Sequence, residues 1–271
     1  MKTYPRVLTI AGSDSGGGAG IQADIKAISA TGSYAESAIT AITVQNTLGV
    51  QSVYPVPPQT IAAQIDSVLG DIGADAVKIG MLHSEEVVRC VKDALLRNST
   101  RNIVLDPVMV STSGHRLIEE AAVEVLSREL IPLADVITPN IPEAEILLGA
   151  VIRSQEDLPE AARKLSRGRV SVLMKAGHLT DSRLVDIFYN AREDRIVELP
   201  SPRIDTPNTH GTGCTLSSAF ASFLARGLSL DEAARRAKDY IASAIESGAE
   251  YSIGHGHGPV DHFFALHKGN C

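Results

Sequence analysis

Short apolar runs alternate with helical patterns along most of the chain, and this alternation constrains the fold more than any other feature. Runs with strand character cover residues 6–11, 34–44, 76–79, 103–110, 135–138 and 170–175. The helical patterns between and around them cover residues 21–30, 60–72, 84–98, 119–130 and 157–166. Strands that alternate with helices form a largely parallel sheet with helices on both faces. We therefore predict a three-layer α/β fold with a central, mostly parallel sheet.

The rest of the chain continues this pattern and shows no sign of a second domain. Residues 183–199 are typical of a hairpin, and helical patterns cover residues 216–225 and 230–247. The 271 residues, of which 44% are hydrophobic, suffice for one large α/β core. Because we find no repeat, linker or low-complexity segment, we predict a single domain over residues 1–271.

Charge and cysteine content limit the possible classes of partner and compartment. A net charge of −7 argues against general binding of nucleic acid and against an anionic membrane surface. Three cysteines, Cys90, Cys214 and Cys271, favour a reducing compartment over a disulfide framework. The apolar run after the N-terminus is too short for a signal peptide, and none approaches the length of a membrane span. We expect a soluble, cytoplasmic protein.

A glycine-rich turn precedes the helix that we predict over residues 216–225. Gly211 and Gly213 would break the chain there and leave the first helical amides unpaired and aimed at one point. The helix dipole adds positive charge, so this cradle suits an anion such as phosphate. Cys214 lies at the same terminus, where we expect a lowered thiol pKa and a thiolate. The alternative is a simple turn with a small buried cysteine.

Polar or glycine-rich residues follow the ends of several predicted strands. They are Gly12, Gln45, Met81, Asp106, Asn140 and Lys175. In a parallel sheet these strand ends lie at one edge, together with the cradle. Such convergence favours a ligand cleft over a set of unrelated turns. Among these residues, a Lys at a strand end could meet a phosphate, and a Gln offers a donor and an acceptor to an aminopyrimidine edge.

Structural roles compete with several of these functional interpretations. Asp24 would either complement the dipole of its helix or accept a hydrogen bond from a ligand. Asn140 and Glu143 have the spacing of a capping box, which competes with a metal role. The glycine loop over residues 12–20 fits neither a P-loop nor a dinucleotide fingerprint. The closely spaced histidines of residues 254–262 suggest a metal site. The glycines between them and the lack of Cys partners favour a mobile loop instead.

Taken together, the motifs resemble those of hydroxymethylpyrimidine/phosphomethylpyrimidine kinase, the thiamine-synthesis branch of the ribokinase-like superfamily. The segments that carry the resemblance are residues 12–24, 44–47, 78–81, 106–109, 138–143, 210–214 and 254–259. They run nearly from end to end of the chain. The resemblance implies a ribokinase-like fold and phosphorylation by ATP, with Mg²⁺, of 4-amino-5-hydroxymethyl-2-methylpyrimidine and then of its monophosphate. It also suggests a homodimer.

The resemblance further assigns roles to residues of this sequence. Those expected to hold the pyrimidine are Gly12, Asp24, Gln45, Met81 and Val108. Those expected to meet the nucleotide, the phosphates or Mg²⁺, the last through water, are Asp106, Asn140, Glu143, Lys175 and Thr212. The cradle residues Gly211, Thr212, Gly213 and Cys214 would stabilise the transferring phosphoryl group. Most members of the superfamily carry Asp at the last cradle position, whereas this branch carries Cys.

Two rival functions are also compatible with the sequence. A pyridoxine/pyridoxal kinase is a nearby branch that can share the cysteine of the cradle, but Gln45 and Met81 favour the pyrimidine. A non-catalytic binding protein on the same scaffold would be expected to lack part of the phosphate side. Asp106, Glu143, Lys175 and the cradle are all present in this chain, which favours a kinase.

Overall fold

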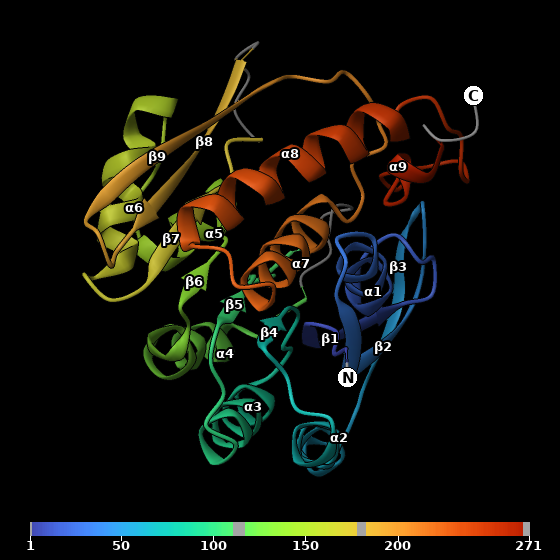
Figure 1. Cartoon of the computed structure of the whole chain (residues 1–271), viewed down its shortest axis with the longest axis vertical. Coiled ribbons are helices and arrows are strands. Elements are labelled where there is room, and N and C mark those ends of the chain that lie inside the picture. Colours follow the sequence, from blue (N-terminus) through green and yellow to red (C-terminus); the bar gives the residue numbers. More distant parts are fainter. Residues whose placement is uncertain (1, 111–116, 178–182, 268–271) are drawn as a thin grey trace.

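A single sheet of nine strands runs through the part of the chain that the computed structural model describes, residues 2–110, 117–177 and 183–267. The strand order is β3-β2-β1-β4-β5-β6-β7-β8-β9 (Figure 1). Their bounds are β1 (Arg6–Asp14), β2 (Tyr34–Asn46), β3 (Gly49–Pro55), β4 (Ala76–Ile79), β5 (Ile103–Leu105), β6 (Val136–Ile137), β7 (Ser171–Met174), β8 (Arg183–Asn190) and β9 (Arg195–Pro202). From β2 to β7 neighbouring strands are parallel, and β3, β8 and β9 add antiparallel edges.

Helices cover both faces of this sheet and give the molecule three layers (Figure 1). One face carries α1 (Gly20–Ala30), α7 (Thr212–Ala225) and α8 (Leu230–Gly248). The other carries α2 (Pro58–Asp71), α3 (Glu85–Arg97), α4 (Glu120–Val125), α5 (Ile141–Leu148) and α6 (Leu158–Ser166). A short helix, α9 (Phe264–His267), follows α8. The predicted fold class is confirmed, while the single domain stays a prediction.

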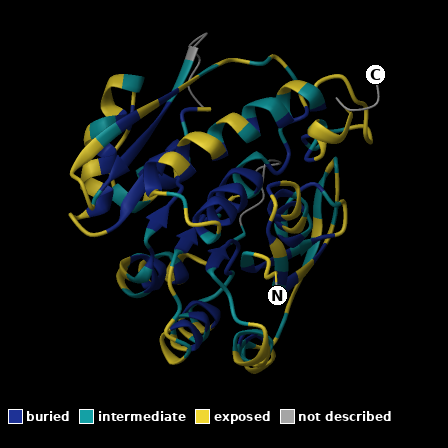
Figure 2. Cartoon of the chain, viewed as in Figure 1, coloured by how far each residue is buried: buried dark blue, intermediate teal, exposed yellow. Residues whose placement is uncertain are grey.

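The core forms as two hydrophobic clusters because the central strands are buried on both faces. Leu8 and Ile10 of β1 face the cluster under α2 and α3, whereas Val7 faces the cluster under α7 and α8. Figure 2 shows the consequence, with buried strands in the middle and helices exposed only on their outer sides. The central strands are therefore buried along nearly their whole length and mostly apolar, as the sequence pattern indicated, with Thr9 and Lys78 among the buried polar exceptions.

Most predicted boundaries are close to the observed ones, and the differences have local causes. Ser84 caps α3, as its position before the helix indicates, by accepting from the Val87 amide at 3.4 Å. Thr60, in contrast, does not cap α2, which begins at Pro58 after Pro57. Strand β5 ends before Asp106 because Pro107 has no N–H to donate to a neighbouring strand. Cys271 lies outside the described residues.

Glu36 on β2 is a buried acid without a hydrogen-bond partner in the described part of the chain. Arg6 and Asp75 lie nearby but pair with each other, at 3.0 Å between Nη2 and Oδ1. Burial therefore raises the pKa of Glu36 to about 7, with Arg6 opposing the shift and Asp75 adding to it. The neutral form of this side chain suits the fold.

We expect Glu36→Gln to stabilise the protein at about pH 8 by about 2 kcal/mol and to have little effect at about pH 4. The folded-state pKa of Glu36 exceeds its unfolded value, so its contribution is fully present below pH 4.5 and is lost as the pH rises through about 7. Urea unfolding at both pH values measures the difference. The exposed Glu250→Gln serves as control. An equal gain at both pH values would contradict the assignment.

Candidate active site

A cavity of about 580 Å³ lies at the carboxyl ends of the parallel strands. The predicted site residues that line it are Gly12, Gln45, Met81, Asp106, Val108, Asn140, Glu143, Lys175, Gly211, Thr212, Gly213 and Cys214. They come from loops and helix starts after β1, β2, β4, β5, β6 and β7, and from the start of α7. The structure thus brings together all but one of the residues that the sequence nominated, whereas their roles stay predictions.

Asp24 is the exception, and the expectation that it faces the ligand is corrected. Its carboxylate is fully buried and is not among the groups that line the cavity. It accepts hydrogen bonds from Thr9 Oγ1 at 2.6 Å and Ser218 Oγ at 2.7 Å, and it forms an ion pair with Lys78 at 2.8 Å. Helix α1 lies against β1, so this side chain points into the layer between helix and sheet.

The glycine turn starts α7 at Thr212, earlier than the helical pattern predicted. Gly211 adopts φ +80°, and its Cα lies against the carbonyl of Gly18, so that a Cβ would overlap it. The Thr212 amide donates to the Thr209 carbonyl at 3.3 Å. Within the described residues, the amides of Gly213 and Cys214 have no protein acceptor. Two of the expected bare amides therefore exist, at the positive end of the helix.

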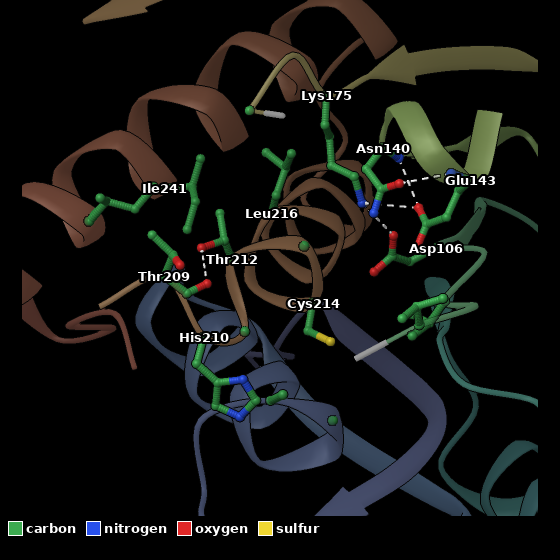
Figure 3. Close-up of a pocket in the computed structure, with 18 of the residues that line it drawn as sticks. Asp106, Asn140, Glu143, Lys175, Thr209, His210, Thr212, Cys214, Leu216 and Ile241 are labelled. Carbon is green, nitrogen blue, oxygen red and sulfur yellow. Dashed lines mark hydrogen bonds and ion pairs between the residues drawn. The ribbon is translucent and has the colours of Figure 1, made fainter. Parts of the chain in front are cut away.

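Cys214 lies at the cavity, but its thiol does not ionise as predicted. Burial raises the pKa of this thiol to about 11; the charge of Lys78 and the Gly20 amide oppose the shift, and Asp24 and Asp106 add to it. Burial therefore outweighs the helix terminus, and the expected thiolate is wrong for the protein without ligands. Figure 3 shows the thiol between His210 on one side and Asp106 on the other.

Four polar side chains form the opposite wall of the cavity (Figure 3). Lys175 Nζ lies 2.8 Å from Asp106 Oδ1 and 3.8 Å from Glu143 Oε2. Asn140 and Glu143 form the predicted capping box of α5: Glu143 Oε2 accepts from the Asn140 amide at 2.8 Å, and Asn140 Oδ1 accepts from the Glu143 amide at 2.9 Å. The cap holds the Glu143 carboxylate beside the lysine, so structural and functional roles coexist.

The charges of this wall depend on one another. Burial raises the pKa of Glu143 to about 7; Lys175 opposes this shift and Asp106 strengthens it. Burial alone would lower the pKa of Lys175, but Asp106 and Glu143 raise it above its ordinary value. The ammonium group therefore stays charged. It lies close to the start of α7, because a Cβ added to Gly213 would be only 3.1 Å from Lys175 Nζ. The Lys175 ammonium and the unpaired amides of Gly213 and Cys214 therefore lie at the same part of the cavity.

A magnesium ion fits these residues only through water. Asp106 is already paired with Lys175, and one oxygen of Glu143 belongs to the capping box. No group of three or more acidic, His or Cys side chains suited to a metal occurs in the described ranges. Mg²⁺ keeps several of its waters and needs few carboxylates when it accompanies nucleotide phosphates. Asp106 and Glu143 suit such outer contacts.

Sequence reasoning assigned no role to Asp14 and His210, which organise the glycine loop. Asp14 Oδ2 accepts from the amides of Gly18 and Ala19 at 3.1 and 2.8 Å, and lies 2.9 Å from His210 Nε2. Burial would raise the pKa of Asp14, but His210 and the loop amides outweigh it and hold the pKa below its ordinary value. The signal was an Asp two residues before a run of glycines, which is typical of a side chain that caps its own loop.

The histidine-containing tail packs against both halves of the site. The His257 amide donates to the Thr47 carbonyl at 2.9 Å, and the His210 amide donates to the Gly258 carbonyl at 3.0 Å. Asn208 Nδ2 donates to the carbonyls of Gly248 and Tyr251 at 2.8 and 2.7 Å. The tail thereby joins the end of β2 to the turn before α7.

Comparison with known proteins decides the family. The family model of phosphomethylpyrimidine kinase matches residues 14–261. The chain belongs to this family. The hydroxymethylpyrimidine/phosphomethylpyrimidine kinase of Haemophilus influenzae is 47% identical over 266 residues, which cover 97% of this chain and 98% of that protein. The resemblance inferred from the motifs is confirmed, and the protein is a kinase.

Other relatives are longer than this chain. The thiamine biosynthesis bifunctional protein ThiED of Geobacter sulfurreducens is 51% identical over 266 residues, which cover 97% of this chain and 53% of that protein. This chain therefore spans about half the length of that bifunctional relative and nearly the whole length of the Haemophilus kinase.

The solved structures that resemble this chain include phosphomethylpyrimidine kinases and pyridoxal kinases, the two kinase branches considered in the sequence analysis. The phosphomethylpyrimidine kinase of Clostridium difficile has a TM-score of 0.78 and 44% identity, covering 89% of this chain and 99% of that chain. The pyridoxal kinase of Bacillus subtilis, in an ADP complex, has a TM-score of 0.89 and 36% identity, covering 97% and 99%. The two branches thus share one fold, and identity is higher to the pyrimidine branch.

The described helices include none that is both long and apolar enough to cross a membrane. The cytoplasmic location stays a prediction.

We expect Gly211→Ala to reduce turnover at least about tenfold, because a side chain at this positive φ would also displace the Gly18 carbonyl and move the cradle. Gly227→Ala is the matched control. Gly227 has φ +86° at the other end of α7, with nothing within 4 Å of an added Cβ. Steady-state ADP release and thermal melting measure both variants. Equal loss of turnover in the two would show that backbone strain alone is responsible.

Proposed function

We propose that this kinase transfers the terminal phosphoryl group of ATP to the hydroxyl of 4-amino-5-hydroxymethyl-2-methylpyrimidine and then phosphorylates the resulting monophosphate. One observation carries the proposal: the bare amides of Gly213 and Cys214 lie in the same cavity as Lys175 and Gln45. The names of close relatives specify the same two substrates. An anion cradle between a cationic wall and a polar pocket suits transfer of a phosphoryl group from a nucleotide to a small polar acceptor.

The pyrimidine would bind on the side of the cavity formed by β1, β2 and β4. A Cβ on Gly12 would lie 3.2 Å from Met81 Sδ, so glycine lets the thioether pack close to β1, where it would offer a polarisable surface to the ring. Gln45 Nε2 lies 3.3 Å from His210 Nε2 and presents its amide at the cavity. An amide can donate and accept at once, which suits the amino group and ring nitrogen of the substrate. Val108 would close the pocket. Asp24 is not proposed as a ligand contact.

The nucleotide would bind on the other side, with its phosphates between α7 and the lysine wall. Lys175, Asn140 and Thr212 would contact the phosphate oxygens, and the ammonium of Lys175 is already oriented by Asp106. Asp106 and Glu143 would hold Mg²⁺ through water, and the ion would neutralise phosphate charge when bound. Such neutralisation would also favour the ionised form of Glu143.

In the first transfer, the substrate hydroxyl oxygen forms a bond to the γ-phosphorus as the bond from that phosphorus to the ADP oxygen breaks. The amides of Gly213 and Cys214 would donate to the migrating phosphoryl oxygens. The hydroxyl proton would leave late, to solvent or product phosphate, because a loose transition state needs little base assistance. A thiol that keeps its proton would position the hydroxyl rather than act as a preformed base.

The second transfer differs because its acceptor is a phosphate oxygen that already carries negative charge. No proton has to leave this acceptor at neutral pH. The cradle and Lys175 would still be required, since charge on the migrating group is the same. Cys214 would matter more for the alcohol than for the monophosphate, because the thiol would position the hydroxyl and not the phosphate oxygen.

ADP release with each acceptor tests the function. We expect stimulation by the pyrimidine alcohol and by its monophosphate, and a kcat/KM for the alcohol at least about tenfold above that for pyridoxal. The comparison with pyridoxal is needed because the Bacillus subtilis pyridoxal kinase shares the fold at a TM-score of 0.89. Greater efficiency on pyridoxal would assign the chain to the other activity, and no stimulation by any acceptor would refute both.

We expect Cys214→Ser to lower kcat for the alcohol by about tenfold or more, with a smaller change in KM. The loss with the monophosphate as acceptor should be smaller, since its attacking oxygen belongs to a phosphate and not to the hydroxyl that the thiol would position. Single-turnover kinetics with each acceptor measure the two steps separately. Near wild-type turnover on both acceptors would remove Cys214 from the reaction while leaving the amides of the cradle in place.

We also propose that the protein is a homodimer, as the family resemblance suggests. Apolar side chains on the β2–β3 edge, among them Ile42, Val44 and Tyr54, are about half exposed or more. A second copy could cover them. Sedimentation of a monomer at micromolar concentration would exclude this assembly.

A further inference from the structure

Lys78 and Asp24 form a fully buried ion pair directly behind the cradle. The Lys78 ammonium donates to both carboxylate oxygens, at 2.8 and 2.9 Å. Thr9 Oγ1 donates to the same carboxylate at 2.6 Å. Burial opposes the charge of Lys78, but Asp24 above all raises its pKa beyond the ordinary value, so the ammonium is retained. Neither residue has a part in the function proposed above.

The pair is attached to the face of α7 that carries Cys214. Ser218 Oγ donates to Asp24 Oδ1 at 2.7 Å, and Ser218 follows Cys214 by one helical turn on the same face. Helix α7 packs on β4, which carries Lys78. The start of the helix, and with it the cradle, is therefore anchored from below by this carboxylate.

The two charges lie at different depths. Lys78 contributes to the wall of the cavity, whereas Asp24 does not. A Cβ on Gly80 would lie 2.9 Å from Lys78 Nζ, so the absence of a side chain at Gly80 leaves room for the ammonium group. The pair is thus a dipole with its positive end toward the cavity, in addition to the dipole of α7. A buried ion pair is weak evidence for added stability, so its orientation suggests another use.

We propose that Lys78 and Asp24 are positioning residues for phosphoryl transfer, which orient the start of α7 and place a positive charge behind the cradle. The proposal rests on the proposed kinase function. Asp24 would supply the anchor and keep the lysine charged. Lys78 would stabilise negative charge that develops on the acceptor and phosphoryl oxygens without touching either ligand.

Cys214 reports on this charge because it lines the same cavity as Lys78 and its thiol is acted on by the charge of Lys78. The groups that act on the sulfur are the cations Lys78 and Lys175, the carboxylates Asp24 and Asp106, and the Gly20 amide. Lys78 favours the thiolate more than any other of these groups. The pH at which this thiol becomes reactive therefore measures the field that the pair creates, and it does so without substrate or turnover.

The experiment follows the alkylation of Cys214 by iodoacetamide against pH, with peptide mass spectrometry to separate it from Cys90 and Cys271. Lys78→Met is expected to slow alkylation at about pH 9 by about tenfold, because the thiol then needs a higher pH to ionise. Lys78→Arg should retain most of the wild-type profile. Ser218→Ala, which removes one hydrogen bond and no charge, should leave the midpoint unchanged.

The double variant Lys78→Met with Asp24→Asn distinguishes an electrostatic role of the ion pair from a purely structural role. It leaves no uncompensated buried charge, so it should fold even where Lys78→Met alone does not. We expect its alkylation to stay slower than that of the wild type and its kcat to fall more than its KM changes. A folded double variant with the wild-type profile would overturn the proposal. Slowed alkylation with unchanged turnover would show that the pair acts on the thiol but would overturn its role in phosphoryl transfer, while ADP release by the wild type tests the kinase function separately.

Discussion

The left-handed turn at Gly211 is the constraint on which the rest of the site depends. Its Cα rests against the carbonyl of Gly18, so the turn before α7 and the glycine loop after β1 must be built together. Once the chain turns there, α7 begins at Thr212, and the next two amides are left without protein acceptors among the described residues. A helix start that the fold leaves unpaired is a place where an anion can be held without cost of reorganisation.

Around this point the protein collects charges that each depend on a neighbour. Lys175 remains an ammonium because Asp106 and Glu143 face it, and Glu143 remains in position because the cap of α5 holds one of its oxygens. Asp14 holds the glycine loop in a similar way. Its carboxylate accepts hydrogen bonds from two loop amides and is paired with His210. Function and local structure therefore use the same hydrogen bonds, and a capping residue can also serve a ligand.

Burial changes the chemistry of the central thiol in a way that its position in the helix would not suggest. A cysteine at a helix start ionises readily when it is exposed, but at Cys214 burial raises the pKa to about 11. In this chain, two helix-start amides without protein acceptors among the described residues thus lie beside a thiol that keeps its proton. This combination suits a reaction in which positive charge and orientation matter more than the strength of a base.

The sequence by itself determined the alternation of strands and helices, the layer order, and the edge of the sheet at which the cavity lies. These follow from apolar periodicity and from the rule that parallel strands end on one side, so the positions of Gln45, Asp106, Asn140 and Lys175 along the chain suffice to group them at one cavity. Only the tertiary structure decided that Asp24 faces inward to Lys78 and that Cys214 keeps its proton. Each of these depends on which groups from distant parts of the chain surround a side chain, and burial and pairing across layers leave no trace in local spacing.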